Sequence, residues 1–192
     1  NNRVLAELMR VEPYTPKPDG IETPSYIYAN YFLARKLAQN ERTALLSAVS
    51  EHFQTKLYTH NQTPDIPLVI NKGPIDYYDT MPYVFKCSKI NLNITLRSIK
   101  NGIPLRCMDI MGAGGFLMTN YQADFLNHFI PDVDYVYFES KDDLLNKCDY
   151  YLKHDDERIA IANNGHKKVK EFHNYKTRLN EIFNIAGLIS PL

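Results

Sequence analysis

The sequence has 192 residues, and at roughly 150 residues per domain this length predicts one sizeable domain with an appended segment. Hydrophobic residues make up 44% and charged residues 23%, which excludes collagen-like, coiled-coil and wholly disordered chains. The 22 basic and 22 acidic side chains give a formal net charge of zero. Because a neutral chain lacks the positive surface that attracts nucleic acid or an anionic membrane, we expect neither as a partner.

The three cysteines form neither a CxxC pair nor a Cys/His metal-ligand pattern. Widely spaced free thiols are typical of a reducing compartment, so we expect a cytoplasmic protein. We expect no membrane span, because no stretch approaches the roughly 18 to 20 apolar residues that a spanning helix needs. The sequence begins with Asn1 rather than methionine, and we therefore expect it to be part of a longer protein.

Residues 1–40 are predicted to hold an irregular arm and an amino-terminal helix. Several helix breakers interrupt residues 12–25, namely Pro13, Pro16, Pro18, Gly20 and Pro24. From Ser25 to Phe53, apolar residues recur at four-residue steps, which predicts two helices. We place the break between them near Gln39 and Asn40.

The chain then alternates between strand-like and helical segments. The predicted strands are residues 55–60, 89–94, 116–119 and 135–138. The predicted helices are residues 104–111, 155–172, 175–186 and a segment after Ser140 that a capping box with Asp143 begins. This alternation favours right-handed crossovers and predicts an α/β fold with a doubly wound, mostly parallel sheet.

Doubly wound sheets bind ligands outside the carboxyl ends of their strands. Asn93 and Thr95 end one predicted strand, and their side chains either contact a ligand or cap the following loop. Thr119, Asn120 and Tyr121 follow the next strand and lead toward a predicted helix. That helix N-terminus either binds a diphosphate or sugar hydroxyls, or these residues form an ordinary cap.

Half of the eight glycines fall between residues 102 and 115: Gly102, Gly112, Gly114 and Gly115. The turn at residues 112–115 precedes a strand and lacks the G-x-G-x-x-G spacing, so it is not a dinucleotide-binding fingerprint. It either ends a helix as a C-cap or lets a phosphate or sugar approach the backbone closely. Both roles are compatible.

Arg106 and Asp109 lie three residues apart on the helix that follows Pro104, and hence on the same helix face. One interpretation is a surface ion pair worth a few tenths of a kcal/mol. The other is that Asp109 accepts hydrogen bonds from the hydroxyls of a ribose while Arg106 binds a diphosphate. The spacing is compatible with both.

Other noticeable groups are interpreted structurally. Acidic residues gather between residues 132 and 143, at Asp132, Asp134, Glu139, Asp142 and Asp143. They lack ligand periodicity, so we interpret them as solvated loop residues and predict no metal site. The pairs Tyr77–Tyr78 and Tyr150–Tyr151 are interpreted as half-buried packing, and His60 as structural or solvent-facing.

Several motifs in order resemble one known family. They are residues 88–93 (SKINLN), Gly102-x-Pro104-x-Arg106-x-x-Asp109, Gly112-x-Gly114-Gly115-Phe116-Leu117, residues 137–144 (YFESKDDL), 150–152, 156–160 and 175–178. Together they resemble the carboxyl-terminal domain of the glycosyltransferase family that includes the CgeB-like spore-coat maturation proteins. The resemblance covers about residues 55–180.

That family resembles the two-Rossmann-domain (GT-B) glycosyltransferases, and this chain is similar to their donor-binding half. The resemblance implies a Rossmann-like nucleotide-sugar-binding domain at residues 41–174 and a carboxyl-terminal helix at 175–192. It also implies transfer of a sugar from a nucleoside-diphosphate donor to an acceptor hydroxyl. The expected partners are that donor and an acceptor domain of the same protein, with no cofactor and no metal.

The resemblance also implies roles for individual residues. Asp109 matches the acidic residue that binds the donor ribose, and Arg106 matches the arginine before it. Gly112, Gly114 and Gly115 match the glycine-rich turn beneath the donor.

Two departures from the family pattern are visible. Lys100 and Asn101 stand where retaining relatives carry a second acid, and Asp109 is one methylene shorter than the more usual Glu. No catalytic residue is assigned, and retention or inversion stays open. A binding module that kept the fold without transfer is therefore an alternative function. A dinucleotide-dependent epimerase is a third, against which the missing G-x-G-x-x-G counts.

Overall fold

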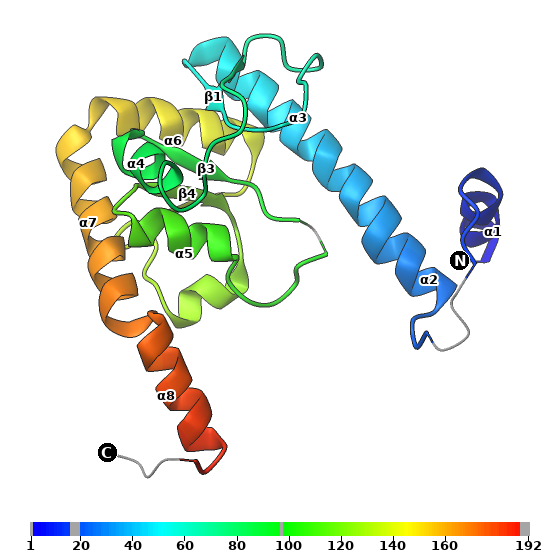
Figure 1. The fold of residues 1–192 in the computed structure, drawn as a ribbon. Coiled ribbons are helices and arrows are strands. Elements are labelled where there is room, and N and C mark those ends of the chain that lie inside the picture. Colours follow the sequence, from blue (N-terminus) through cyan, green and yellow to red (C-terminus); the bar gives the residue numbers. More distant parts are fainter. Residues whose placement is uncertain (1, 16–19, 97, 189–192) are drawn as a thin grey trace.

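The structure is a computed structural model that describes residues 2–15, 20–96 and 98–188. Its amino-terminal part consists of α1 (Asn2–Val11), α2 (Pro24–Ile27), a π-helical segment η1 (Tyr28–Leu33) and α3 (Ala34–His52). In Figure 1, α2 and α3 belong to one long helical rod whose far end lies near α1, away from the sheet. The predicted irregular arm is thus partly helical, since α1 occupies residues for which we predict no helix. Residues 16–19 of that arm lie outside the described residues.

The predicted helix break near Gln39 and Asn40 is wrong, because α3 continues through both residues. Asn and Gln lower helix propensity only slightly, and both side chains here are exposed to solvent. Ala38 and Leu45 lie on the buried side of the same helix. The helix therefore also crosses residue 40, where the arm is predicted to end.

Most of the remaining elements follow the predicted alternation of strands and helices, but a strand at residues 70–71 and a helix at residues 81–87 were not predicted. The remaining elements are β1 (Lys56–Leu57), β2 (Ile70–Asn71), α4 (Met81–Cys87), β3 (Asn91–Asn93), α5 (Leu105–Gly112), β4 (Leu117–Asn120), a 3-10 helix η2 (Ala123–Asn127), β5 (Val136–Phe138), α6 (Lys141–Lys153), α7 (Asp155–Phe172) and α8 (Tyr175–Ile185). Residues 189–192, at the end of the predicted carboxyl-terminal segment, are outside the described ranges.

The central sheet has three parallel strands in the order β3-β4-β5. Asn93 pairs in register with Thr119, and Thr119 pairs with Tyr137. The α/β class with a parallel sheet is thereby confirmed, and the predicted strands at 89–94, 116–119 and 135–138 form this sheet.

The predicted strand at residues 55–60 does not join the central sheet. Its residues Lys56 and Leu57 form β1, which pairs in parallel with β2 in a separate two-stranded sheet. The Leu57 carbonyl accepts a hydrogen bond of 2.8 Å from the Lys72 N–H. The backbone groups of this segment thus find partners in residues 70–72 rather than in the central sheet.

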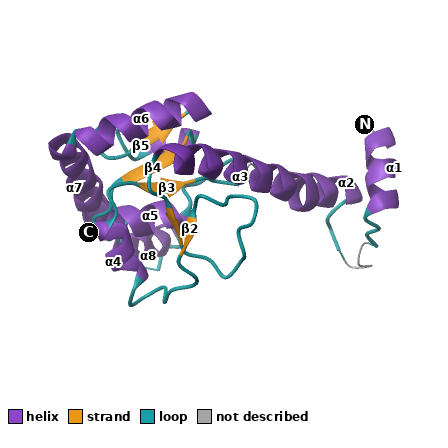
Figure 2. Ribbon diagram, turned by 90° about the horizontal axis from the view of Figure 1, so that it is seen from above, coloured by secondary structure: helices purple, strands orange, loops and turns teal. Residues whose placement is uncertain are grey.

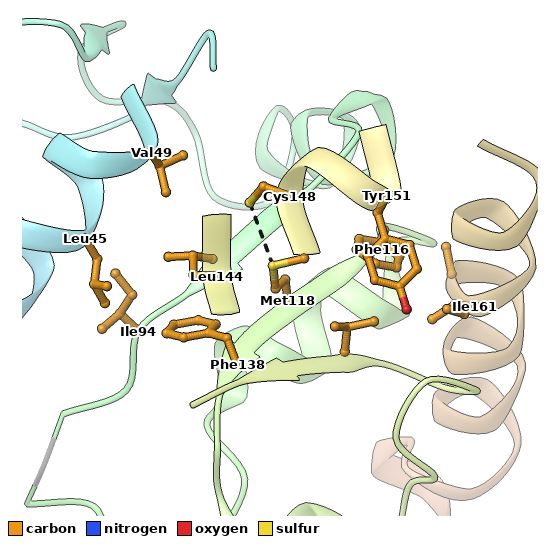
Figure 3. Packing of buried hydrophobic residues seen from close by; sticks show 12 residues of the cluster. Leu45, Val49, Ile94, Phe116, Met118, Phe138, Leu144, Cys148, Tyr151 and Ile161 are labelled. Atoms are coloured by element: carbon orange, nitrogen blue, oxygen red, sulfur yellow. Dashed lines mark hydrogen bonds between the residues drawn. The ribbon is translucent and has the colours of Figure 1, made fainter. Parts of the chain in front are cut away.

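Helices cover both faces of the central sheet, as a doubly wound fold requires (Figure 2). On one face, Phe116, Met118, Val136 and Phe138 pack against α3, α6 and the first half of α7. Figure 3 shows this cluster, with Cys148 beside Met118 and Tyr151 against Phe116. Full burial of each large apolar side chain contributes about 1.5–3 kcal/mol to stability.

On the opposite face, the side chains of α5 and η2 pack against the alternate residues of the strands. This second cluster comprises Cys107, Ile110, Met111, Leu117, Phe125, Phe129, Tyr135 and Val169. Because successive strand residues point to opposite faces, Phe116 and Met118 belong to the first cluster and Leu117 to the second.

Helix α6 begins as its capping box predicts. The Ser140 hydroxyl accepts a 3.1 Å hydrogen bond from the Asp143 N–H, and the Asp143 carboxylate accepts one of 3.0 Å from the Glu139 N–H. The bond to Ser140 satisfies an N–H group that the first turn of a helix leaves without a partner, and the second bond holds the residue just before the N-cap. Within the described ranges, no helix combines the length and apolarity needed to cross a membrane.

Candidate functional site

The carboxyl ends of β3 and β4 carry a buried cluster of polar side chains. The Asn93 amide donates hydrogen bonds of 3.0 Å to the hydroxyls of Thr95 and Thr119. All three side chains are buried, and Thr119 is fully inaccessible. The structure thus brings these predicted site residues together, but Asn93 uses both of its amide hydrogens within the protein.

Asn120 belongs to the same edge of the sheet. Its side-chain oxygen accepts a 2.7 Å hydrogen bond from the Thr95 N–H, which ties the end of β4 to the segment after β3. From the side of α3, the Arg42 guanidinium donates hydrogen bonds of 2.7 and 3.1 Å to the Ile94 carbonyl. The edge where a ligand is expected is therefore held by side-chain contacts from three elements.

Tyr121 follows β4 and is 45% exposed, with its ring edge-on to the Tyr137 ring at 5.3 Å. The helix predicted after it is a short 3-10 helix, η2, which begins at Ala123. A 3-10 helix of five residues does not provide the aligned N–H groups of an α-helix N-terminus. The predicted α-helix is therefore a short 3-10 helix, whereas donor binding by Thr119, Asn120 and Tyr121 stays a prediction. Tyr121 is an exposed aromatic side chain at this edge.

The glycine-rich turn ends α5 and leads into β4. Gly114 has φ +81° and donates a 2.9 Å hydrogen bond to the Met111 carbonyl, while Gly115 donates one of 2.9 Å to the Ile110 carbonyl. This is the Schellman pattern that terminates a helix at a left-handed residue. The turn lies at the amino end of β4, whereas Thr119 and Asn120 lie at its carboxyl end.

Gly115 is also needed for packing. A Cβ atom there would lie 2.6 Å from the Phe85 carbonyl oxygen and 2.7 Å from the Asn91 amide nitrogen. At Gly112, by contrast, a Cβ would make an ordinary 3.7 Å contact with Val169. The connection between α5 and β4 therefore accounts for Gly114 and Gly115, since protein atoms fill the space that a Cβ of residue 115 would need.

Asp109 and Arg106 lie on α5 and share a neighbour in the segment before α4. The Tyr77 hydroxyl donates a hydrogen bond to Oδ2 of Asp109, and the Arg106 guanidinium lies 5.5 Å from the centre of the Tyr77 ring. The guanidinium is also 5.6 Å from the Phe85 ring. Arg106 and Asp109, both within the described part of the chain, form no ion pair with each other. The surface ion-pair interpretation is therefore wrong.

The Tyr77 contact is a feature that the sequence pattern missed. Tyr77 is 42% exposed and Tyr78 84% exposed, so the predicted half-buried packing of this pair is wrong for Tyr78. The hydrogen bond to Asp109 is the main reason why the pKa of the Tyr77 phenol is raised, with burial second. The phenol therefore stays protonated and able to donate across the physiological range.

Lys100 and Asn101, which the resemblance places where retaining relatives carry a second acid, are both exposed. They lie in the loop between β3 and α5. The adjacent Gly102 has φ +87° and its N–H donates a hydrogen bond to the Asp124 carboxylate, which anchors this loop to η2.

Behind Asp109, α5 is firmly packed on the sheet. Burial raises the pKa of the Cys107 thiol to about 12, and a hydrogen bond with Thr119 opposes that shift. The thiol is therefore neutral at physiological pH and is part of the core rather than a nucleophile.

The acidic residues near β5 are partly structural. Asp134 is buried, and its carboxylate accepts hydrogen bonds of 2.8 Å from the Ile130 N–H and 2.7 Å from the Lys168 ammonium. Asp143 binds Lys147 at 2.9 Å. The solvated-loop interpretation is thus wrong for both. Among the described residues, no group of three or more His, Cys, Asp or Glu side chains could hold a metal ion.

Two shallow depressions lie away from Asp109. One, of about 310 Å³, is lined by α7 and the segment before β5 and includes Lys167 and Phe172. The other, of about 270 Å³, lies between Tyr31 and Arg35 of the long helical rod and Leu96 after β3. The second is on the side of the loop that follows β3, whereas Asp109 is partly exposed on α5 and Tyr77 is exposed in the segment before α4.

Comparison with known proteins gives a family. The glycosyl transferase-like family matches residues 33–184, which is most of the chain. The chain belongs to the glycosyl transferase-like family. No curated protein sequence matches it.

Solved structures share the fold. The carboxyl-terminal domain of LpcC, a glycosyl transferase group 1 family protein from Francisella tularensis, has 14% identity and a TM-score of 0.55, covering 70% of this chain and 80% of that one. Anabaena HepE (Alr3699) in complex with UDP has 13% identity and a TM-score of 0.61, and its complex with UDP-glucose has 12% and 0.59. Both HepE matches cover 81% of this chain and 52% of that one, so the chain spans about half of HepE. This glycosyl transferase-like chain therefore has the fold of the carboxyl-terminal half of a GT-B enzyme.

Proposed function

We propose that this chain is the donor-binding half of a CgeB-like glycosyltransferase of the GT-B type. It binds the nucleoside diphosphate of a nucleotide sugar beside α5, and the sugar is transferred to an acceptor hydroxyl with an amino-terminal acceptor domain of the same protein as partner. Membership of the glycosyl transferase-like family and the fold shared with a UDP-bound and a UDP-glucose-bound structure support this proposal.

The observation that carries the proposal is the position of the Asp109 carboxylate. It is partly exposed on α5, and its hydrogen-bond partner is the hydroxyl of an exposed tyrosine rather than a buried group. An ionised carboxylate accepts hydrogen bonds at two oxygens, which suits the two neighbouring hydroxyls of a ribose. Arg106, one turn before it and exposed, supplies the positive charge that a diphosphate needs.

The other predicted site residues have different roles in this proposal. Tyr121 and Asn120 line the edge of the sheet and would contact the donor. Asn93 and Thr119, which are buried and bonded to each other, would support that edge from within. The glycine turn would fix the end of α5, and with it the position of Asp109.

The experiment that tests the proposal compares wild type with Asp109→Asn by calorimetric titration with UDP and 2′-deoxy-UDP. Hydrogen bonds to a charged group contribute about 1.5–3 kcal/mol, so the substitution should lower UDP affinity roughly 10- to 100-fold. Wild type should prefer the ribose form, and Asp109→Asn should lose that preference. Asp149→Asn, on the exposed outer side of α6, is the matched control and should bind UDP like wild type.

Equal ribose preference in wild type and Asp109→Asn would remove Asp109 from the site. Titration in EDTA and in Mg²⁺ belongs to the same experiment, because a site in which Arg106 balances the diphosphate should bind UDP in both. Strict dependence on Mg²⁺ would contradict that role.

A second candidate function is binding without transfer. It is favoured by the exposed Lys100 and Asn101 at the position where retaining relatives carry an acid. Incubation of the full-length protein, which includes the proposed acceptor domain, with UDP-glucose separates the two functions. Release of UDP shows turnover, and binding without release favours the second. We also propose a reducing, cytoplasmic location, which the free thiols of Cys87, Cys107 and Cys148 support.

A further inference from the structure

Tyr77 contacts both residues to which the proposed function assigns donor binding. Its hydroxyl donates a hydrogen bond to Oδ2 of Asp109, and its ring lies under the Arg106 guanidinium at 5.5 Å. We propose that Tyr77 is a gating residue of the nucleotide site, whose phenol takes the place of a ribose hydroxyl on Asp109 and leaves when a nucleoside diphosphate binds. This inference rests on the proposed role of Asp109.

The chemistry of the contact is that of a substitute ligand. A phenol and a ribose hydroxyl are both O–H donors, and an ionised carboxylate only accepts. Two ribose hydroxyls bind best when each has one carboxylate oxygen, but Oδ2 is already engaged by Tyr77. The raised pKa of Tyr77 agrees with a donor that is stabilised in its protonated form. A ribose hydroxyl therefore competes with the Tyr77 hydroxyl for Oδ2 of Asp109.

Local hydrogen bonds, rather than contacts with the hydrophobic core, keep the conformation of the segment that carries Tyr77. The Asp76 carboxylate accepts hydrogen bonds of 2.8 Å from the Tyr78 N–H and 2.6 Å from the Asp79 N–H, which form a local turn. Gly73, at φ +75° with open space around its Cα, precedes this turn. None of the residues from 72 to 80 is buried. Displacing the turn therefore exposes little apolar surface.

The charge of Arg106 is coupled to the same movement. While Tyr77 is in place, the guanidinium lies against the Tyr77 and Phe85 rings. When Tyr77 leaves, Arg106 keeps its contacts with the Phe85 ring and the Met81 sulfur, and the side of the guanidinium that faced the Tyr77 ring becomes accessible to a diphosphate. One side chain thus controls access to the ribose acceptor and to the positive charge.

A competing role and a supporting role of Tyr77 predict opposite changes in UDP affinity when its hydroxyl is removed. If Tyr77 occupies the site, Tyr77→Phe removes the competing donor and makes binding tighter. The loss of one hydrogen bond between partly exposed groups should raise UDP affinity about 2- to 10-fold. If Tyr77 instead orients Asp109 or contacts the nucleotide, the same substitution makes binding weaker.

The test is calorimetric titration of UDP into wild type, Tyr77→Phe, Asp109→Asn and the double variant. Tyr78→Phe is the matched control, since it removes the neighbouring hydroxyl in the same turn and should leave UDP affinity unchanged. We expect tighter binding for Tyr77→Phe only, and no gain from Tyr77→Phe in the Asp109→Asn background, because the two residues act through one contact.

The outcomes separate this inference from the proposed function. If wild type binds UDP with the expected loss in Asp109→Asn, but Tyr77→Phe binds equally or more weakly, the gating role is overturned and the donor site stands. A gain in Tyr77→Phe that persists in the Asp109→Asn background also overturns it, since the effect would not pass through Asp109. If wild type and Tyr77→Phe both fail to bind UDP, the proposed function fails and the gating role with it.

Discussion

The side-chain amide of Asn93 on β3 donates a 3.0 Å hydrogen bond to the Thr119 hydroxyl on the neighbouring strand β4. The two residues are in register in the parallel sheet, and both are buried against the α5 side. This polar contact lies between the core and the edge where the donor is proposed to bind. Loss of this hydrogen bond should therefore change both the stability of the sheet and the positions of the residues at that edge.

Asn93→Ala is expected to destabilise the protein by about 1–3 kcal/mol, because it leaves the buried Thr95 and Thr119 hydroxyls without this donor. The free energy of unfolding from urea titration measures the effect. Asn163→Ala, on the exposed side of α7, serves as the control and should change stability by less than about 0.5 kcal/mol. Equal stability of both variants would show that the Asn93 network contributes nothing.

Two alanine substitutions in the glycine turn should differ strongly. Gly115→Ala places a Cβ 2.6 Å from the Phe85 carbonyl oxygen and should cost about 1–3 kcal/mol through overpacking. Gly112→Ala introduces only an ordinary 3.7 Å contact with Val169 at the end of α5. It should be neutral or stabilise by up to about 1 kcal/mol, because alanine reduces the entropy of the unfolded chain. Thermal unfolding of the two variants compares them directly, and a destabilisation of similar size in both would contradict the packing argument.

His173 should make stability depend on pH. Burial is the main cause that lowers its pKa below the usual value of 6.5, followed by repulsion from Arg178, His128 and Lys168. The unfolded chain therefore binds the proton more readily than the folded one. The stability that His173 contributes is complete above about pH 6.5 and is lost as the pH falls through the folded-state pKa.

Urea unfolding between about pH 7.5 and pH 5 tests this expectation. His173→Gln should lose less stability on acidification than wild type does. His60→Gln removes an exposed histidine and should follow the wild-type curve. A wild-type slope that survives in His173→Gln would assign the effect to other groups.

The cysteines should differ in reactivity. Cys87 is exposed, whereas Cys107 and Cys148 are buried and burial raises their pKa values to about 12 and about 11. An aromatic disulfide reagent at pH 8 should therefore modify Cys87 rapidly in the folded protein and the other two only after unfolding. Cys87→Ser should abolish the fast phase, and a fast phase that remains would show that a buried thiol is accessible.

Strong local patterns placed much of the fold correctly. The continuous apolar runs at 116–119 and 135–138 are strands of the central sheet, and the Ser140 capping box begins α6. Such patterns could not predict which strand residues 55–60 pair with, because a short strand pairs with the backbone that the tertiary fold brings next to it. Helix α4 was missed since it has only seven residues and contains Pro82 in its first turn.

The candidate site was partly predictable. Asp109 and Arg106 were identified from spacing and family resemblance, but their contact with Tyr77 depends on a segment 32 residues earlier in the sequence that has no periodicity. Asn93 and Thr95 were predicted either to contact a ligand or to cap the following loop, and Asn91 precedes them in the same alternation. All three side chains are in fact buried and bonded, because α5 covers that face of the sheet.

Helix α7, like strand β4, contributes side chains to both hydrophobic clusters. Its first half contributes Ile161 and Ala162 to one cluster, and Val169 near its end belongs to the other. The two layers should therefore melt in a single cooperative step, with α7 amides among the slowest to exchange their hydrogens. By contrast, the described residues of α8 contain no buried side chain. A shorter version of this protein for crystallography or NMR should therefore keep all of α7 and can end just after it.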